Sequence, residues 1–82
     1  MLEDIGIDAI VGTKQVVKAI QAGTLAHMYL ADDVEPYLHA KLTAAGNENG
    51  VEIRRVPTME DLGKACKIDV GAACVGIRKP TA

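Results

Sequence analysis

Two lysines and a glutamine stand close together near the start of the chain, in the stretch Gly12-Thr13-Lys14-Gln15-Val16-Val17-Lys18. The apolar spacing predicts a helix here, and Lys14, Gln15 and Lys18 then share one exposed face. Lysine donates to phosphate oxygens or guanine acceptors, whereas glutamine both donates and accepts on a base edge. These residue types and spacings indicate a site for an anion or a nucleic acid.

The position of Lys14 is unfavourable for helix stability alone. A helix N-terminus carries about half a positive charge, so a cation there costs a few tenths of a kcal/mol, up to roughly 1. Lys14 and Lys18 also form a like-charge pair, which costs roughly 0.2–0.5 kcal/mol. Free N–H groups beside positive charge bind phosphate readily, but a solvated helix face stays an open alternative.

The residue inventory gives little support to an enzyme. The chain has no serine, and its only histidines are His27 and His39. Each histidine is better explained as a packed or surface side chain than as a general base. Cys66 and Cys74 are too few for a disulfide framework or a zinc site. We therefore expect no catalytic residue, no cofactor and no metal.

The charge of the chain is acidic overall and positive only locally. The 82 residues carry a net charge of −2, which argues against a protein that coats nucleic acid indiscriminately. Residues 12–23 nevertheless contain two lysines and no acid, and residues 62–71 contain Lys64 and Lys67 against Asp69. A specific partner at a local site fits this distribution better than a broad one.

Length and hydropathy predict a small cytoplasmic protein. No apolar run reaches the roughly 20 residues of a membrane span, and the acidic start Met1-Leu2-Glu3-Asp4 lacks the basic lead of a secretory signal. We expect one domain over residues 1–82, without membrane contact and monomeric.

Strands and helices alternate along the chain with short connections. Apolar runs predict four strands, at residues 9–11, 25–31, 51–56 and 72–77. Helical patterns fill the intervals, at residues 13–22, from 34 to about 48, and from Thr58 to about 67. The pattern predicts an α/β fold, a three-layer α-β-α sandwich around a small mixed four-stranded sheet.

Two capping residues are predicted at helix starts. The acidic cluster Asp32-Asp33-Glu35 is explained by Asp33 capping a helix with Pro36 in its first turn, which is simpler than a metal site. Thr58 is placed to cap the following helix, whose first turn has Glu60 and Asp61.

Three separated motifs resemble the kink-turn RNA-binding ribosomal protein family, the L-seven-Ae family, and in particular its small bacterial ribosomal-protein-like members. The motifs occupy residues 12–19, 61–66 and 70–77 and appear in the right order and spacing. The resemblance implies a three-layer α-β-α fold. It also implies recognition of the kink-turn, a sharply bent RNA element with tandem sheared G·A pairs, in ribosomal RNA, a riboswitch or another non-coding RNA, and possibly membership of the ribosome or a ribonucleoprotein.

The resemblance also implies a set of RNA-contacting residues. Lys14 and Gln15 would meet the guanines of the sheared pairs, and Lys18 a base or a phosphate. The loop of residues 68–72 would pack against a flipped-out nucleotide. The full set is Gly12, Thr13, Lys14, Gln15, Lys18, Lys64, Ile68, Asp69, Val70, Gly71 and Ala72.

The chain departs from the family pattern at a few of these positions. Archaeal relatives typically have Asn-Glu where this chain has Lys14-Gln15, and relatives often have threonine in place of Val17. Lys67 stands where relatives often have glycine, and it either adds a phosphate contact or stiffens the loop. Two alternative functions stay open: a small nucleotide- or ligand-binding α/β module, and a protein-interaction domain that uses Ile68 and Val70.

Overall fold

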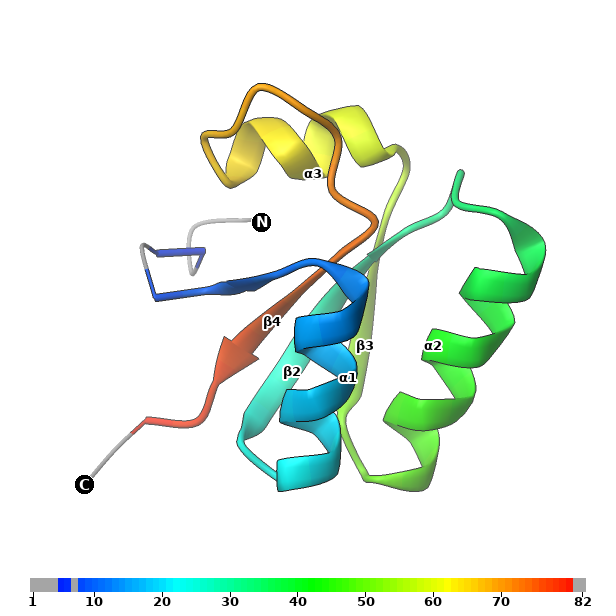
Figure 1. Ribbon diagram of the computed structural model, residues 1–82, viewed down its shortest axis with the longest axis vertical. Coiled ribbons are helices and arrows are strands. Elements are labelled where there is room, and N and C mark those ends of the chain that lie inside the picture. Colours follow the sequence, from blue (N-terminus) through cyan, green and yellow to red (C-terminus); the bar gives the residue numbers. More distant parts are fainter. Residues whose placement is uncertain (1–4, 7, 81–82) are drawn as a thin grey trace.

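The structure is a computed structural model that describes residues 5–6 and 8–80 (Figure 1). Helices and strands alternate within these residues, as predicted. The elements in chain order are β1 (Ile10–Val11), α1 (Thr13–Ala22), β2 (Leu25–Ala31), α2 (Pro36–Glu48), β3 (Glu52–Val56), α3 (Met59–Ala65) and β4 (Cys74–Arg78).

The four strands form one mixed sheet in the order β1-β4-β2-β3. Strand β4 runs antiparallel to both of its neighbours, whereas β2 and β3 are parallel. Parallel strands need a crossover connection, which α2 supplies between β2 and β3. The predicted α/β class and the mixed four-stranded sheet are confirmed.

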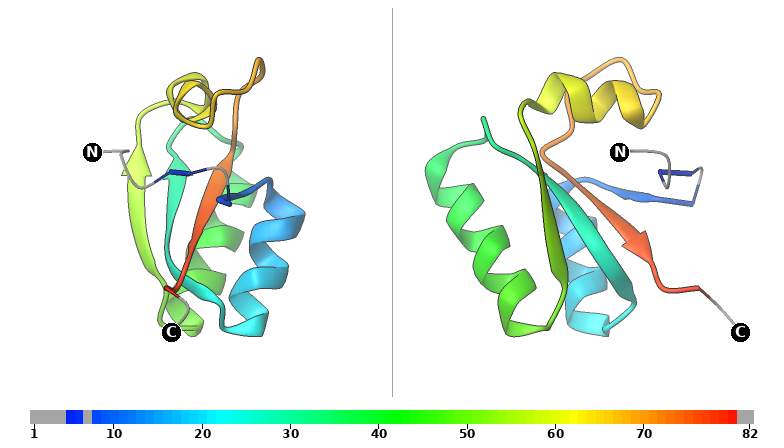
Figure 2. Two further views of the ribbon diagram at one scale, coloured as in Figure 1. Left: turned by 90° about the vertical axis from the view of Figure 1, so that its left-hand side faces the viewer. Right: turned by 180° about the vertical axis from the view of Figure 1, so that it is seen from behind.

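The helical layers on the sheet are unequal. Helices α1 and α2 lie together on one face, and the short helix α3 lies across the end of the sheet where β2 and β3 finish (Figures 1 and 2). The core between the sheet and its helices holds fully buried apolar side chains. Among them are Val16 and Ile20 of α1, Met28 and Leu30 of β2, and Leu42 of α2.

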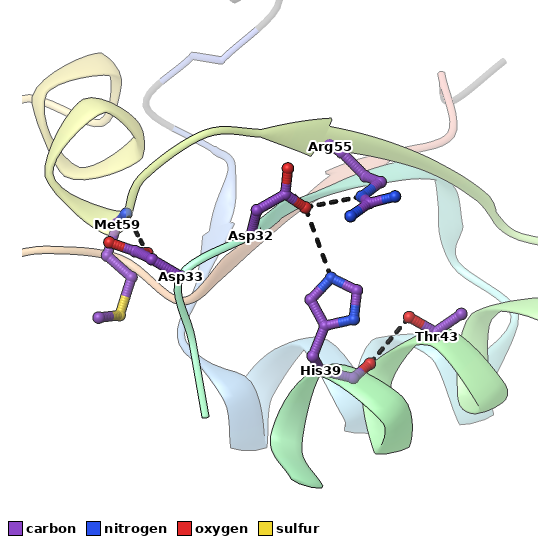
Figure 3. A network of polar contacts seen from close by, with 6 residues as sticks. All are labelled: Asp32, Asp33, His39, Thr43, Arg55 and Met59. Carbon is purple, nitrogen blue, oxygen red and sulfur yellow. Dashed lines mark hydrogen bonds and ion pairs between the residues drawn. The ribbon is translucent and has the colours of Figure 1, made fainter. Parts of the chain in front are cut away.

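The caps of the helices differ in part from the prediction. Thr58 caps α3 as expected, because its side chain accepts from the N–H of Asp61 at 3.0 Å. Asp33 does not cap α2, whose N-cap residue is Glu35 with no side-chain bond. The Asp33 carboxylate instead accepts from the N–H of Met59 at 2.8 Å, at the start of α3 (Figure 3). This bond ties the loop after β2 to α3.

The neighbouring carboxylate of Asp32 joins that loop to β3 and α2 (Figure 3). Its Oδ1 atom accepts from Arg55 Nε at 2.6 Å and lies 3.5 Å from His39 Nε2. The hydrogen bond from Arg55, supported by His39, lowers the pKa of Asp32 below its ordinary value. Asp32 and Asp33 of the acidic cluster therefore hold neighbouring elements together. Of the two, only Asp33 accepts a hydrogen bond from the start of a helix.

We predict that Asp33→Ala lowers the free energy of unfolding by about 0.5–2 kcal/mol, the usual cost of a lost helix cap. Glu35→Ala is the matched control, because that side chain makes no cap bond, and it should change stability by less than about 0.5 kcal/mol. Urea titration followed by circular dichroism measures both variants. Equal stability of the two would contradict the assigned role of Asp33.

Candidate nucleic-acid interface

Helix α1 begins after a glycine whose backbone only glycine adopts easily. Gly12 has φ 104° and ψ 146°, and its N–H donates to the carbonyl oxygen of Cys74 at 3.2 Å. A Cβ atom at Gly12 would have no neighbour within 4 Å, so the backbone conformation and not space requires glycine. Strand β4 thus fixes the point at which α1 starts.

The first turn of α1 has no side-chain cap and no acidic residue. Its leading N–H groups are therefore open to a ligand. Lys14, Gln15 and Lys18 are all exposed, as predicted, while Val16 between them is fully buried. Two cations and an amide project from a rigidly packed helix start, which can hold an anion or the polar edge of a base.

Thr13 lies closer to the core than Lys14, Gln15 and Lys18. Thr13 is half-buried, and its side chain is hydrogen-bonded to the thiol of Cys74. Burial raises the pKa of Cys74 to about 11, and the bond from Thr13 acts in the opposite direction. Of the two predicted residues that open this helix, Gly12 sets the backbone and Thr13 faces inward.

The loop of residues 68–72 carries the second group of predicted contacts. Val70 is 70% exposed and Ile68 is 36% exposed, so neither side chain completes the core. Ala72 differs, because it is only 3% exposed and its N–H donates to the carbonyl of Met59 at 3.0 Å. The loop is therefore anchored at Ala72 and offers Ile68, Asp69 and Val70 to the outside.

A close backbone contact with α3 fixes the shape of this loop. A Cβ atom at Gly63 would lie 2.2 Å from the carbonyl oxygen of Val70, a distance that no side chain can occupy. On the other side, a Cβ atom at Gly71 would lie 3.0 Å from the Cβ of Met59. Glycine at position 63 is thus required for α3 and the loop to approach each other.

An open hollow of about 360 Å³ lies between α3 and the loop. Lys64 lines it and forms an ion pair with Glu60 at 3.3 Å. The sequence prediction included Lys64 and missed Glu60, although the spacing of four residues on a helix signals such a pair. The complete lining is Glu60, Lys64, Ile68, Asp69, Val70 and Gly71.

The turn that ends helix α3 contains a lysine, Lys67, in a backbone conformation that favours glycine. The N–H of Lys67 bonds to the carbonyl of Lys64 at 3.0 Å, and the N–H of Ile68 bonds to that of Gly63 at 3.2 Å. These two bonds form a Schellman motif, in which Lys67 has φ 60° and is the only non-glycine residue with positive φ in the described part of the chain. A left-handed side-chain residue costs about 1–2 kcal/mol, more than the 0.3–1 kcal/mol that a cation gains at a helix C-terminus.

The two predicted groups lie at the same end of the sheet (Figure 1). The connection is direct, because the bond from Gly12 to Cys74 joins the start of α1 to the first residue of β4, and the loop leads into β4. The structure therefore places the start of α1 and the loop of residues 68–72 at the same end of the sheet. These segments are separated by about fifty residues in the sequence.

Other kinds of site find no support in the described residues. Within residues 5–6 and 8–80, no three His, Cys, Asp or Glu side chains form a group that could hold a metal ion. None of the helices in that part of the chain is long and apolar enough to cross a membrane. Cys66 and Cys74 are free, with Cys74 buried and Cys66 half-buried.

Known proteins share this fold and sequence pattern. The sequence profile described as "Ribosomal protein L7Ae/L30e/S12e/Gadd45 family" matches residues 8–82. The chain is 46% identical over 68 residues to a protein of Geobacillus kaustophilus named RNA-binding protein GK0100, a match that covers 83% of each chain. It is 41% identical over 63 residues to the large ribosomal subunit protein eL8 of Cenarchaeum symbiosum, covering 76% of this chain and 50% of that one.

A solved structure supports the fold. The Giardia lamblia 15.5kD RNA binding protein matches with a TM-score of 0.80 at 23% identity, over 88% of this chain and 61% of that chain. Since the sequence relatives are named as RNA-binding and ribosomal proteins, the prediction of a non-enzymatic protein is confirmed.

We predict that Gly63→Ala lowers the free energy of unfolding by about 1–3 kcal/mol, because the new methyl group forces α3 and the loop apart. The backbone amide signals of residues 68–72 should shift in a nitrogen–proton correlation spectrum. Gly50→Ala is the control: it strains a left-handed glycine with φ 69° that has no neighbour within 4 Å. Loop signals that move equally in both variants would contradict the proposed contact.

Proposed function

The chain belongs to the ribosomal protein L7Ae/L30e/S12e/Gadd45 family and is an RNA-binding protein, and we propose that it recognises the kink-turn. The observation that carries the proposal is the placement of an uncapped, lysine-bearing helix start at the same end of the sheet as an exposed apolar loop. Structured RNA offers a partner for each part of such a surface. Its base edges and phosphates suit the helix start, and its unstacked bases suit the apolar loop.

Helix α1 supplies the polar half of the proposed interface. Lys14 and Gln15 stand at its first turn and donate to the guanines of the sheared G·A pairs. Lys18, one turn further on, meets a base or a phosphate. Gly12 leaves the helix start bare of side chains, so the RNA can approach the free N–H groups of the first turn.

The loop supplies the apolar half. Ile68 and Val70 project from a backbone that is held against α3, and a flipped-out nucleotide packs on them. Asp69 and Gly71 belong to the same contact, and Lys64 lies beside it. Ala72 acts as the anchor of the loop, because its side chain is buried.

The action we propose is a shift of RNA populations. A protein that binds only the kinked conformer stabilises it over the extended one by the difference in binding free energy. The whole chain, residues 1–82, acts as one domain and as a monomer. We place it in the cytoplasm, on ribosomal RNA, a riboswitch or another non-coding RNA, because a relative is named as a protein of the large ribosomal subunit.

A gel-shift titration on two RNA duplexes tests the proposal. One duplex contains a kink-turn, and in the other the tandem G·A pairs are changed to Watson–Crick pairs. We expect at least tenfold tighter binding to the kink-turn, since a specific contact to the sheared pairs is worth about 1–3 kcal/mol each. Equal affinity for the two duplexes would exclude kink-turn recognition while leaving general RNA binding intact.

Lys14→Ala and Gln15→Ala should each weaken binding to the kink-turn by about 1–3 kcal/mol. Both side chains are exposed, so the melting temperature should stay nearly constant. Matched controls lie away from the start of α1: Lys41→Ala on α2, and Gln21→Ala near the other end of α1, on the same helix face but about two turns from Lys14. Isothermal titration calorimetry measures the affinities. A loss of stability that parallels the loss of affinity would show that this face has a structural role instead.

A further inference from the structure

The left-handed backbone of Lys67 costs more than its positive charge gains at the C-terminus of α3. Its φ of 60° lies in the left-handed region, where a side chain is strained and glycine is not. The Schellman bonds that end the helix use only the backbone of residues 67 and 68, so glycine at position 67 would preserve them. Strain that is kept without a structural gain points to a use for the side chain.

Among the described residues, no charged group is paired with the ammonium of Lys67. Lys64, the other lysine of this segment, is paired with Glu60 at 3.3 Å. Lys67 is exposed, and no ion pair or side-chain hydrogen bond of its ammonium is found among residues 5–6 and 8–80. Asp69, two residues further on, is the acid of the exposed loop. Without Lys67 the outer surface of this loop would have a net negative charge, which repels phosphate.

We infer that Lys67 is an RNA-binding residue whose ammonium contacts a backbone phosphate next to the nucleotide held by the 68–72 loop. A lysine is suited to phosphate, because it is a flexible point charge that requires no fixed orientation. The left-handed backbone at Lys67 starts the loop and directs it back along α3 toward β4. The inference rests on the proposed RNA-binding function and adds a contact on the α3 side of the interface.

Three substitutions separate the charge of Lys67 from its backbone strain. Lys67→Gln removes the charge and keeps the strain, Lys67→Gly removes both, and Lys67→Arg keeps both. Affinity for the kink-turn duplex is measured by gel shift from low to moderate salt, and the melting temperature of the free protein is measured alongside. Lys41→Gln on α2 is the matched control for the loss of an exposed charge.

The inference predicts that Lys67→Gln and Lys67→Gly bind roughly three- to tenfold more weakly at low salt. The slope of log affinity against log salt should fall by about 1 in both variants, because one phosphate contact is lost. Lys67→Arg and Lys41→Gln should bind like the wild type. The melting temperature should fall only slightly in Lys67→Gln, which loses a cation at a helix C-terminus, and should be equal or higher in Lys67→Gly, which also loses the strain.

Wild-type affinity and slope in Lys67→Gln would overturn the inference. Affinity losses that follow a lower melting temperature would also overturn it, because Lys67 would then stiffen the loop. A failure of the proposed function gives a different result. The wild type would then bind both duplexes equally, yet Lys67→Gln would still lower the salt slope on both. A phosphate contact is independent of sequence. If the wild type binds neither duplex, both proposals are overturned.

Discussion

The candidate interface depends on the close approach of two backbone segments, at Gly63 in α3 and at Val70 in the loop that follows. Any side chain at position 63 would collide with the Val70 carbonyl oxygen, as the 2.2 Å distance to a Cβ shows. The same loop is held at Ala72 by the carbonyl of Met59, whose N–H is held by Asp33. A chain of backbone contacts thus positions Val70 relative to α3 and to the loop after β2, so an exposed apolar side chain stands on a fixed support.

Helix α3 follows the charge preferences of helix ends, and helix α1 does not. Helix α3 has a threonine cap and two acids in its first turn, and a lysine in its last. Helix α1 has none of these devices and has a lysine in its first turn. Burial of Val16 and Ile20 gives about 1.5–3 kcal/mol each, which exceeds the penalty of roughly 1 kcal/mol from misplaced charge. Packing therefore holds α1 in place despite the unfavourable position of Lys14 on its exposed face.

The sequence was informative wherever structure follows from local pattern. Periodicity located all four strands and three helices, and Thr58 was recognised as a cap because a capping bond spans only three residues. It was less informative where a polar or apolar group finds its partner far along the chain. Asp33 bonds to the start of α3, twenty-six positions away, and not to the adjacent α2, while Ala72 is buried and its N–H bonds to the Met59 carbonyl in α3. The end of α3 at Ala65 also precedes the predicted end near residue 67, because the Schellman turn reverses the chain there.

Both halves of the candidate interface are held in place by contacts within the protein. The start of α1 is joined to β4 through Gly12, and the loop is joined to α3 through Gly63 and Ala72. A protein surface that is already rigid loses little conformational entropy on binding, so the ordering cost falls on the RNA. Such a surface discriminates between RNAs by their geometry. Both contacts form together only with an RNA that presents base edges and an unstacked nucleotide at the matching separation. The glycines at 12 and 63 have no side chains of their own, yet each fixes the position of side chains in the candidate interface.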